Sequence, residues 1–343
     1  MARAGGELVS EVLRDYGAVA RRHMQRYLTQ RSGAELYELA QDYPKRGGRS
    51  LRASFCLATA RAFGASLEQA LDSAIALELL HNAFLVHDDI EDDSEERRGA
   101  PTLHRLHDVP TAINVGDALV AMSFRPLLYN HKTLGPRLAW KIAEETERMA
   151  RESVEGQALE LSWRRGNRTE LADEDYLQMI LKKTCWYTTI YPARVGALIG
   201  ARAELSSHSY VRFGFFLGAA FQIQDDLLNL VGDHERYLKE LNGDLWEGKR
   251  TLMLLHLSRN ASAGERARLE GILALPRVER RARDIRWMRS RMDAYGSIEY
   301  ARGVAHALAG AALHEFELDF GALPPSRDKA FIEALPYWVL ERS

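Results

Sequence analysis

The chain has 343 residues, of which 46% are hydrophobic and 27% charged, an ordinary composition for a globular protein. Its formal net charge of −2 provides no broad basic surface, so we expect no nucleic-acid partner. Its two cysteines, Cys56 and Cys185, have no paired spacing, which excludes a disulfide framework or a zinc ribbon and suits a reducing, cytoplasmic setting. No apolar stretch reaches the roughly 20 residues of a membrane span, and the first residues lack the apolar core of a secretory signal.

Helix-forming residues dominate the chain, and strand signals are rare. Ser66 and Gln69 have the spacing of a capping box, and the apolar pattern that follows predicts a helix from there to the acidic residues near 90. Further helices are expected over 116–128, 134–163, 173–201, 209–232 and 277–296. Pro126 and Pro192 are expected to kink or break their helices, and 164–173 is expected to form a loop. The sequence thus predicts one all-α domain, residues 1–343, of about ten helices.

The first long helix ends in HDDIEDDSEERRG, residues 87–99. Asp88 and Asp92 lie four residues apart and share a helix face with His81, and Asp89 lies beside them. Like charges at a helix C-terminus are unfavourable, so a solvated acidic surface does not account for this pair after an apolar helix. A hard divalent cation with oxygen ligands accounts for it better.

The second apolar helix ends in a similar way, with Asp225, Asp226 and Asn229 in FQIQDDLLN. Two such helix ends indicate ligand sets that face each other across a cavity between helices. Cationic residues complete the pattern, some directly after the first acidic cluster and others in separate segments: Arg97 and Arg98; Lys45, Arg46, Arg49 and Arg52; Lys182 and Lys183; and Lys239, Lys249 and Arg250. Singly, each of these is more typical of a solvated surface. Together with the carboxylates they indicate a metal-dependent site for diphosphate esters.

These segments resemble the motifs of the trans-isoprenyl diphosphate synthases, the polyprenyl synthetase family. DDIED followed by RRG resembles the first aspartate-rich motif, and FQIQDDLLN resembles the second. Five further segments resemble family landmarks, in family order: RGGRSLR, NVGD, GQALEL, KKT and GDLWEGKRT. The set is specific, although no single segment is.

The resemblance implies an all-helical isoprenoid synthase-type bundle around a central cavity, assembled as a homodimer, with three Mg²⁺ ions, isopentenyl diphosphate and an allylic diphosphate as ligands. It implies that Asp88, Asp89, Asp92 and Asp225 bind the metal ions and, with them, the allylic diphosphate. It assigns further positive charge near that diphosphate to Arg97, Lys183, Lys249 and, less closely matched, Lys239. It assigns isopentenyl diphosphate to Arg49, Arg52, His81 and Arg98, and the reacting centre to Thr184 and Gln222.

The sequence departs from the family pattern at several positions. Arg49 stands in place of the usual Lys, Ser50 in place of a basic residue and Glu160 in place of Asp. Asn229 replaces the third aspartate of the second motif, and Thr251 is not followed by the common Pro. All three aspartates of the first motif are present, so activity is expected, and the second metal site is the part that these departures put in question.

The expected product is geranylgeranyl diphosphate. Phe84 lies one turn before Asp88, and Ala83 precedes it; one aromatic and one small residue at these positions indicate a product of intermediate length. Phe84 as an ordinary core residue is the alternative interpretation. Three alternatives stay open: a farnesyl diphosphate synthase, a class I terpene cyclase and a non-catalytic subunit of a heteromeric synthase. The terpene cyclase is considered because DDLLNLVGD loosely resembles the second metal motif of that class.

Overall fold

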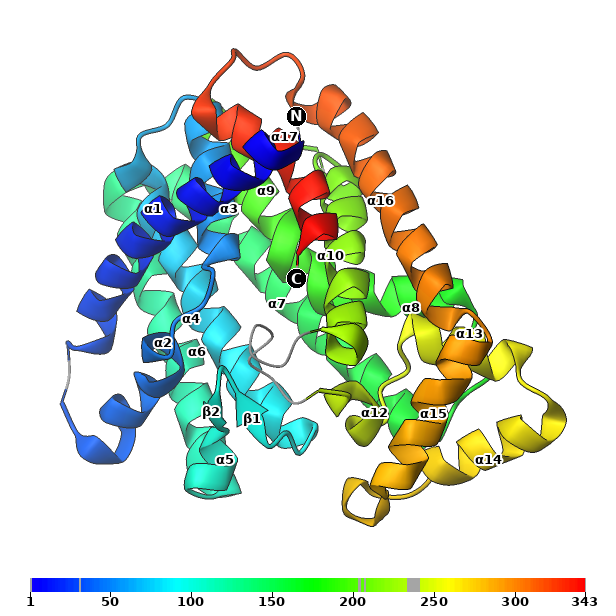
Figure 1. Ribbon diagram of the computed structural model, residues 1–343. Coiled ribbons are helices and arrows are strands. Elements are labelled where there is room, and N and C mark those ends of the chain that lie inside the picture. The colour runs from blue at the N-terminus through cyan, green and yellow to red at the C-terminus, as the bar shows by residue number, and fades with distance from the viewer. Residues whose placement is uncertain (1, 31, 203–204, 207, 233–240, 343) are drawn as a thin grey trace.

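The computed structural model describes residues 2–30, 32–202, 205–206, 208–232 and 241–342. Its described residues form a bundle of helices, in which the first helix of the chain packs against the last (Figure 1). The helices of the first half are α1 (Ala2–Leu28), η1 (Ala34–Glu38), α2 (Asp42–Lys45), α3 (Leu51–Ala62), α4 (Leu67–Glu91), α5 (Leu103–Leu106), α6 (Val109–Leu134) and α7 (Pro136–Arg165). The expected all-α class is confirmed.

The helices of the second half are α8 (Asp173–Ile180), η2 (Leu181–Ile190), α9 (Tyr191–Ala201), α10 (Val211–Val231), α12 (Gly243–Glu247), α13 (Leu252–Asn260), α14 (Ala263–Leu273), η3 (Arg277–Glu279), α15 (Ala282–Ala294), α16 (Ser297–Phe320) and α17 (Arg327–Glu341). Helical segments outnumber the ten or so that the sequence indicated, because the shortest ones carry no apolar periodicity of their own. The described strands, β1 (Glu96–Arg97) and β2 (Ala100–Pro101), pair as a small antiparallel hairpin that was not predicted.

Helix α4 begins and ends close to where its sequence indicated. The Ser66 backbone N–H donates to Gln69 Oε1 at 2.9 Å and the Gln69 N–H donates to Ser66 Oγ at 3.4 Å, which confirms the capping box. The helix is apolar on nearly every side because it packs against α1, α3 and α6 within the bundle. Its last turn carries the first aspartate motif out of this core.

Neither Pro126 nor Pro192 breaks its helix in the expected way. Helix α6 continues through Pro126, because its packing along α4 outweighs the one backbone hydrogen bond that a proline removes. Pro192 lies in the first turn of α9, where the backbone N–H that a proline lacks is not needed for a hydrogen bond within that helix. The segment 173–201, predicted as one helix, is divided into α8, η2 and α9.

The middle part of that segment, η2, is a π-helix held between α7 and α10. Glycines make both contacts possible. A Cβ atom on Gly156 of α7 would lie 2.2 Å from the backbone nitrogen of Lys183, and one on Gly218 of α10 would lie 2.9 Å from Cys185 Sγ. Because neither glycine has a side chain, the wide helix fits between its neighbours and carries Lys183 and Thr184 into the centre of the bundle.

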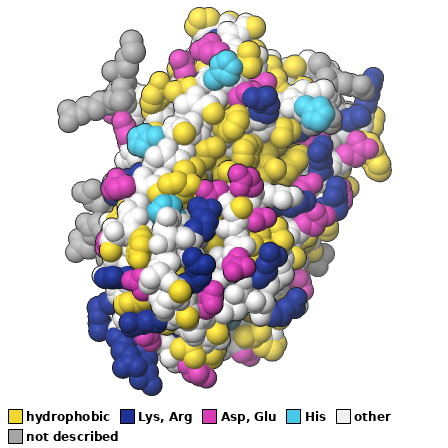
Figure 2. Space-filling model, turned by 90° about the vertical axis from the view of Figure 1, so that its right-hand side faces the viewer, with side chains coloured by type: hydrophobic (Ala, Val, Ile, Leu, Met, Phe, Trp, Pro, Cys, Tyr) yellow, Lys and Arg dark blue, Asp and Glu magenta, His cyan; other side chains and the backbone are white. Residues whose placement is uncertain are grey.

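The face over α13 to α16 carries acidic and basic side chains together, with Lys and Arg most frequent toward the lower left of the view in Figure 2. Within the described residues, no helix is both long and apolar enough to cross a membrane.

Candidate active site

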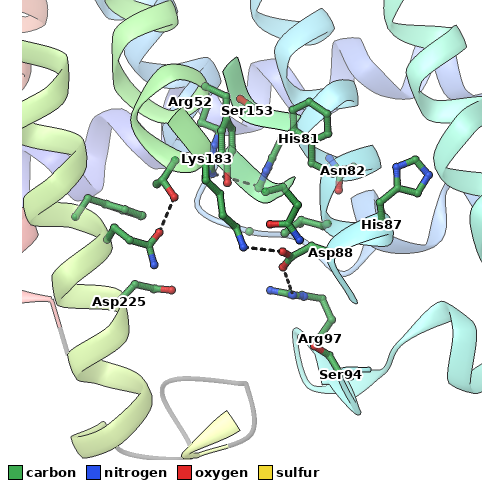
Figure 3. Close-up of a pocket in the computed structure, with 18 of the residues that line it drawn as sticks. Arg52, His81, Asn82, His87, Asp88, Ser94, Arg97, Ser153, Lys183 and Asp225 are labelled. Carbon is green, nitrogen blue, oxygen red and sulfur yellow. Dashed lines mark hydrogen bonds and ion pairs between the residues drawn. The ribbon is translucent and has the colours of Figure 1, made fainter. Parts of the chain in front are cut away.

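A cavity of about 810 Å³ lies between α3, α4, α7, η2 and α10. Charged residues from the ends of α4 and α10 line one part of it, and Asp88, Lys183 and Asp225 point into the same space in Figure 3. Apolar residues line another part: Leu80, Phe84, Leu85, Val120, Met179 and Ile180. The cavity therefore offers an ionic region and an apolar region to one ligand.

Asp88 is the aspartate of the first motif that lines the cavity. Its Oδ1 lies 3.2 Å from Lys183 Nζ, and its Oδ2 lies 3.5 Å from Arg97 Nη2. Burial opposes ionisation of this carboxyl, but the charges of Lys183, Lys249 and Arg97 outweigh that effect and lower its pKa below the ordinary value. Asp88 is therefore ionised at neutral pH.

Asp89 is fully buried and does not line the cavity. Tyr43 Oη donates to its Oδ2 at 2.5 Å, and Arg97 binds both of its oxygens, with Nε 2.9 Å from Oδ1. The carboxylate thus fixes Arg97, whose guanidinium also reaches Asp88. In this state Asp89 orients a cation and makes no contact with the cavity.

Asp92 is also buried outside the cavity lining. It accepts a hydrogen bond from Arg164, and its Oδ2 lies 2.7 Å from Lys249 Nζ. Lys249 lies 2.7 Å from Glu247 as well, and its pKa is raised because the attraction of these carboxylates outweighs burial. Lys249 itself lines the cavity, so its charge faces a ligand there.

In the second motif, both aspartates line the cavity. Asp225 lines the cavity and lies 3.4 Å from Arg342 Nη2, on the turn that ends α17. Asp226 is buried and accepts hydrogen bonds from Tyr176 and Gln222, each at 2.7 Å. Burial raises the pKa of Asp226 to about 7, against the effect of these hydrogen bonds. Asn229 lines the cavity, and its Oδ1 accepts the backbone N–H of Asp244 at 3.1 Å.

A second cationic group lies along α3 and α4. Arg52 Nη1 lies 3.2 Å from His81 Nε2, and its Nη2 donates to Thr188 Oγ1 at 2.9 Å. Its guanidinium also lies 4.4 Å from the centre of the Tyr187 ring, a cation–π distance. Arg98 donates to the Tyr43 carbonyl at 2.7 Å, and burial lowers its pKa to about 10, still well above neutral.

Phe84 lies in the cavity wall, as its spacing from Asp88 indicated. Its ring meets the Tyr187 ring edge to face, with centres 5.9 Å apart. Ala83 is fully buried and does not line the cavity. The residue that continues the wall one turn further from the motif is Leu80.

The cavity brings together most of the residues that the sequence singled out. These line it: Arg49, Arg52, His81, Phe84, Asp88, Arg97, Arg98, Lys183, Thr184, Gln222, Asp225 and Lys249. Asp89 and Asp92 lie behind the wall and bind cations that face it. Lys239 lies outside the described residues.

Comparison with known proteins agrees with this arrangement. The family model for polyprenyl synthetase matches residues 33–289. The chain belongs to the polyprenyl synthetase family. It is 32% identical to a short chain isoprenyl diphosphate synthase of Methanothermobacter thermautotrophicus, over 97% of this chain and 98% of that protein.

Other members of the family are similarly close. A geranylgeranyl pyrophosphate synthase of Geoglobus acetivorans is 34% identical over 72% of this chain and 76% of that protein. The crystal structure of the geranylgeranyl pyrophosphate synthetase from Pyrococcus horikoshii Ot3 superposes with a TM-score of 0.85 at 30% identity, covering 98% of this chain and 99% of that one. The polyprenyl synthetase fold therefore extends along nearly the whole chain.

Several residues of this polyprenyl synthetase site were not found from the sequence. Tyr43, Tyr176 and Arg164 bind the carboxylates from outside the motifs, and Glu247, within GDLWEGKRT, pairs with Lys249. Isolated tyrosines and arginines carry no spacing signal, so only the fold reveals them. Arg342 belongs to the last turn of the chain and reaches Asp225 because α17 packs against α10.

Replacing Arg97 with Ala should destabilise the protein strongly, because it leaves the buried Asp89 carboxylate with Tyr43 alone. Removing one partner of a buried ion pair typically costs about 3–5 kcal/mol of the free energy of unfolding, which chemical denaturation measures. Arg105→Ala is the matched control, since its partners Asp93 and Glu95 are exposed and such pairs contribute about 0–1 kcal/mol. Equal losses in the two variants would contradict the buried-pair interpretation.

Proposed function

We propose that the chain, as a single polyprenyl synthetase-like domain, is a short-chain all-trans prenyl diphosphate synthase. It condenses isopentenyl diphosphate with an allylic diphosphate and forms geranylgeranyl diphosphate. The observation that carries this proposal is the cavity itself: Asp88 from α4 and Asp225 from α10 line the same space as Lys183 and an apolar wall. The printed names of the relatives, geranylgeranyl and short-chain isoprenyl diphosphate synthases, support it.

The reaction breaks the allylic carbon–oxygen bond, forms a carbon–carbon bond to the isopentenyl double bond and releases a proton. Lys183, Lys249 and Arg97 supply fixed positive charge to the departing diphosphate. The apolar wall around Phe84 excludes water from the allylic cation that forms. The chain thus stabilises the two separated charges by different parts of one cavity.

We propose Mg²⁺ as the cofactor, in three ions. The available donors fit a hard cation, because Asp88 and Asp225 offer oxygen ligands only and a diphosphate supplies more. Among the described residues, no three carboxylate, imidazole or thiol groups form a ready-made metal cluster. Asp89 and Asp92 would join the ligand set by releasing Arg97 and Lys249. When bound, Mg²⁺ neutralises diphosphate charge as a Lewis acid.

Incubation of the purified protein with isopentenyl diphosphate, farnesyl diphosphate and Mg²⁺ should give a twenty-carbon diphosphate, and excess chelator should abolish it. Chromatography of the dephosphorylated products measures this. A product no longer than fifteen carbons, from shorter primers, supports the farnesyl alternative. A cyclic hydrocarbon supports the terpene cyclase, and no product at all supports the non-catalytic subunit. Undiminished turnover in chelator would reject the metal.

We propose that Arg49, Arg52, His81 and Arg98 bind isopentenyl diphosphate. The support is their common position along the cavity wall, apart from the aspartates. Arg52 is held in place by His81, Thr188 and the Tyr187 ring, so its guanidinium is oriented before a ligand arrives. A preorganised guanidinium suits a diphosphate better than a mobile one.

Arg52→Ala should raise the Michaelis constant for isopentenyl diphosphate about ten- to a hundredfold, since a hydrogen bond to a charged group contributes about 1.5–3 kcal/mol. The constant for the allylic primer should change much less. Steady-state kinetics with each substrate varied in turn measure both. Arg61→Ala on the same helix is the control, because Arg61 pairs with Asp328 outside the cavity. Equal effects on both substrates argue against two separate diphosphate sites.

We propose that Phe84 limits the length of the prenyl chain. A tail anchored at Asp88 meets this ring one turn along α4, with Tyr187 packed against it. Phe84→Ala should extend the cavity as far as Leu80 and shift the products beyond twenty carbons, which chromatography measures. Phe63→Ala is the matched control, a partly buried ring that packs on Tyr210 and Phe320 away from the cavity. An unchanged longest product in a folded Phe84→Ala variant places the limit elsewhere.

We propose a homodimer formed through α6 and α7, which pack side by side. Large apolar side chains on these helices are exposed: Phe124 by 57%, Leu128 by 71% and Trp140 by 68%. Val154 of α7 is both exposed and part of the cavity lining, so a second copy on this face would also cover the cavity there. An apolar patch of this kind is typical of an interface between identical chains.

Phe124→Asp together with Leu128→Asp should convert the dimer to a monomer, because a second copy would bury two unpaired carboxylates. Light scattering coupled to size-exclusion chromatography measures the mass. Val278→Asp is the control, an equally conspicuous exposed side chain on η3, away from α6 and α7. A monomeric wild-type protein, or a dimer unaffected by both substitutions, contradicts the proposed interface.

We propose the cytoplasm as the location, because Cys56 and Cys185 are both buried, free thiols. Cell fractionation with an antibody to the protein tests this, and recovery in an oxidising compartment argues against it.

A further inference from the structure

We infer that Asp226 and Tyr176 fix the direction of the Gln222 side-chain amide, and through it the direction of the Thr184 hydroxyl group at the reacting centre. In this assignment Asp226, which lines the cavity beside the proposed metal ligand Asp225, is a positioning residue. The inference rests on the proposed condensation reaction, because it concerns the charge that develops in that reaction.

A chain of three hydrogen bonds joins these four side chains. Tyr176 Oη donates to Asp226 Oδ2 at 2.7 Å, and Gln222 Nε2 donates to Asp226 Oδ1 at 2.7 Å. Thr184 Oγ1 donates to Gln222 Oε1 at 2.9 Å. Tyr176 is 1% exposed, Asp226 6% and Thr184 4%, so these three side chains are shielded from bulk water, while Gln222 between them is partly buried.

The identities of the donors determine the direction of the chain. In its ionised form Asp226 only accepts hydrogen bonds, so it turns the NH₂ group of Gln222 toward itself. The amide oxygen of Gln222 then faces Thr184, whose hydroxyl proton must point to it. A hydroxyl group has one proton, and once that proton is used only the oxygen lone pairs of Thr184 remain for the cavity.

The reversed arrangement is unfavourable while Asp226 is present. A rotated Gln222 amide would place its oxygen against the Asp226 carboxylate, two acceptors with no proton between them. Its NH₂ group would donate to Thr184, whose hydroxyl proton would then be directed into the cavity. Hydrogen bonds to charged groups are worth more than neutral ones, which makes a buried carboxylate an effective means of selecting one of the two amide orientations.

The selected orientation suits the chemistry of the cavity. Thr184 follows Lys183 in η2 and lines the same space as Asp88 and Asp225. When the allylic diphosphate ionises, positive charge develops on a carbon close to the departing diphosphate. Oxygen lone pairs directed at that carbon stabilise the charge, and a proton directed at it opposes the charge. The π-helix and its glycine contacts hold Thr184 rigidly enough for this preference to matter.

Asp226→Asn tests the inference with nearly the same side-chain shape. The Tyr176 hydroxyl needs an acceptor and takes the new amide oxygen, so the new NH₂ group faces Gln222 and reverses it. The rate of a single turnover should fall about tenfold or more, the scale of one charge-assisted hydrogen bond. The Mg²⁺ concentration that gives half of the maximal rate should stay the same, and so should the Michaelis constants of both diphosphates.

A double-mutant cycle with Thr184→Val isolates the pathway. Thr184→Val alone should slow the turnover, Thr184→Ser should keep most of it, and Asp226→Asn should cost little more once the hydroxyl group is absent. Asp319→Asn is the matched control, because Asp319 is a half-buried carboxylate of α16 outside the cavity, and its replacement should leave the turnover rate unchanged. Circular dichroism and thermal melting establish that each variant is folded.

Three results would overturn the inference. A raised Mg²⁺ requirement, with the rate restored at high Mg²⁺, makes Asp226 a metal ligand. Losses that multiply in the double variant make its role independent of Thr184. An unchanged rate in a folded Asp226→Asn variant means that the amide direction has no effect. If the wild-type protein forms no condensation product under the same conditions, it is the proposed function that fails.

Discussion

The structure depends above all on the pairing of buried carboxylates with cations supplied by the chain. Asp89 binds Arg97, Asp92 binds Arg164 and Lys249, and Asp88 reaches Lys183. A single unpaired carboxylate is too costly to bury in a bundle of this kind, so each acid at the end of α4 dictates where a cation must come from. Under the proposed function, the same cations also bind the diphosphate groups of the substrates. Folding and ligand binding therefore draw on one set of charges.

This constraint explains why distant parts of the chain meet at the end of α4. Lys183 arrives on η2, Lys249 on the segment after α12 and Arg164 at the end of α7. The glycines at 156 and 218 let η2 lie close enough to its neighbours to deliver its lysine. Asp226 has a related role in the inferred arrangement, because it sets the direction of two uncharged groups, the Gln222 amide and the Thr184 hydroxyl group.

The sequence was sufficient for the all-α class and for α4 with its capping box, because these follow from periodicity and from spacing along single helices. The family resemblance pointed to many of the charged residues that line the cavity. It was insufficient where a side chain has two possible partners. The spacing placed Asp88, Asp89 and Asp92 together. It did not show that Asp89 and Asp92 lie behind the cavity wall, where they bind Arg97 and Lys249. It placed Ala83 beside Phe84, yet the rotation of α4 buries Ala83. Tyr43, Tyr176 and Arg342 contribute through tertiary packing, which leaves no local pattern.

The shared use of charges leads to a clear expectation for metal binding. Without a diphosphate, Asp88 and Asp92 are already neutralised by lysines and arginines; a bound diphosphate gives those cations another partner and frees the carboxylates. Calorimetric titration of Mg²⁺ into the protein, alone and with inorganic diphosphate, measures this coupling. The account predicts that Mg²⁺ binds weakly to the protein alone and more tightly when diphosphate is present, after correction for the Mg²⁺ that diphosphate binds in solution. The expected increase in affinity is roughly 5–150-fold, the range that couplings between sites usually reach. Equally tight Mg²⁺ binding in the two titrations would contradict it.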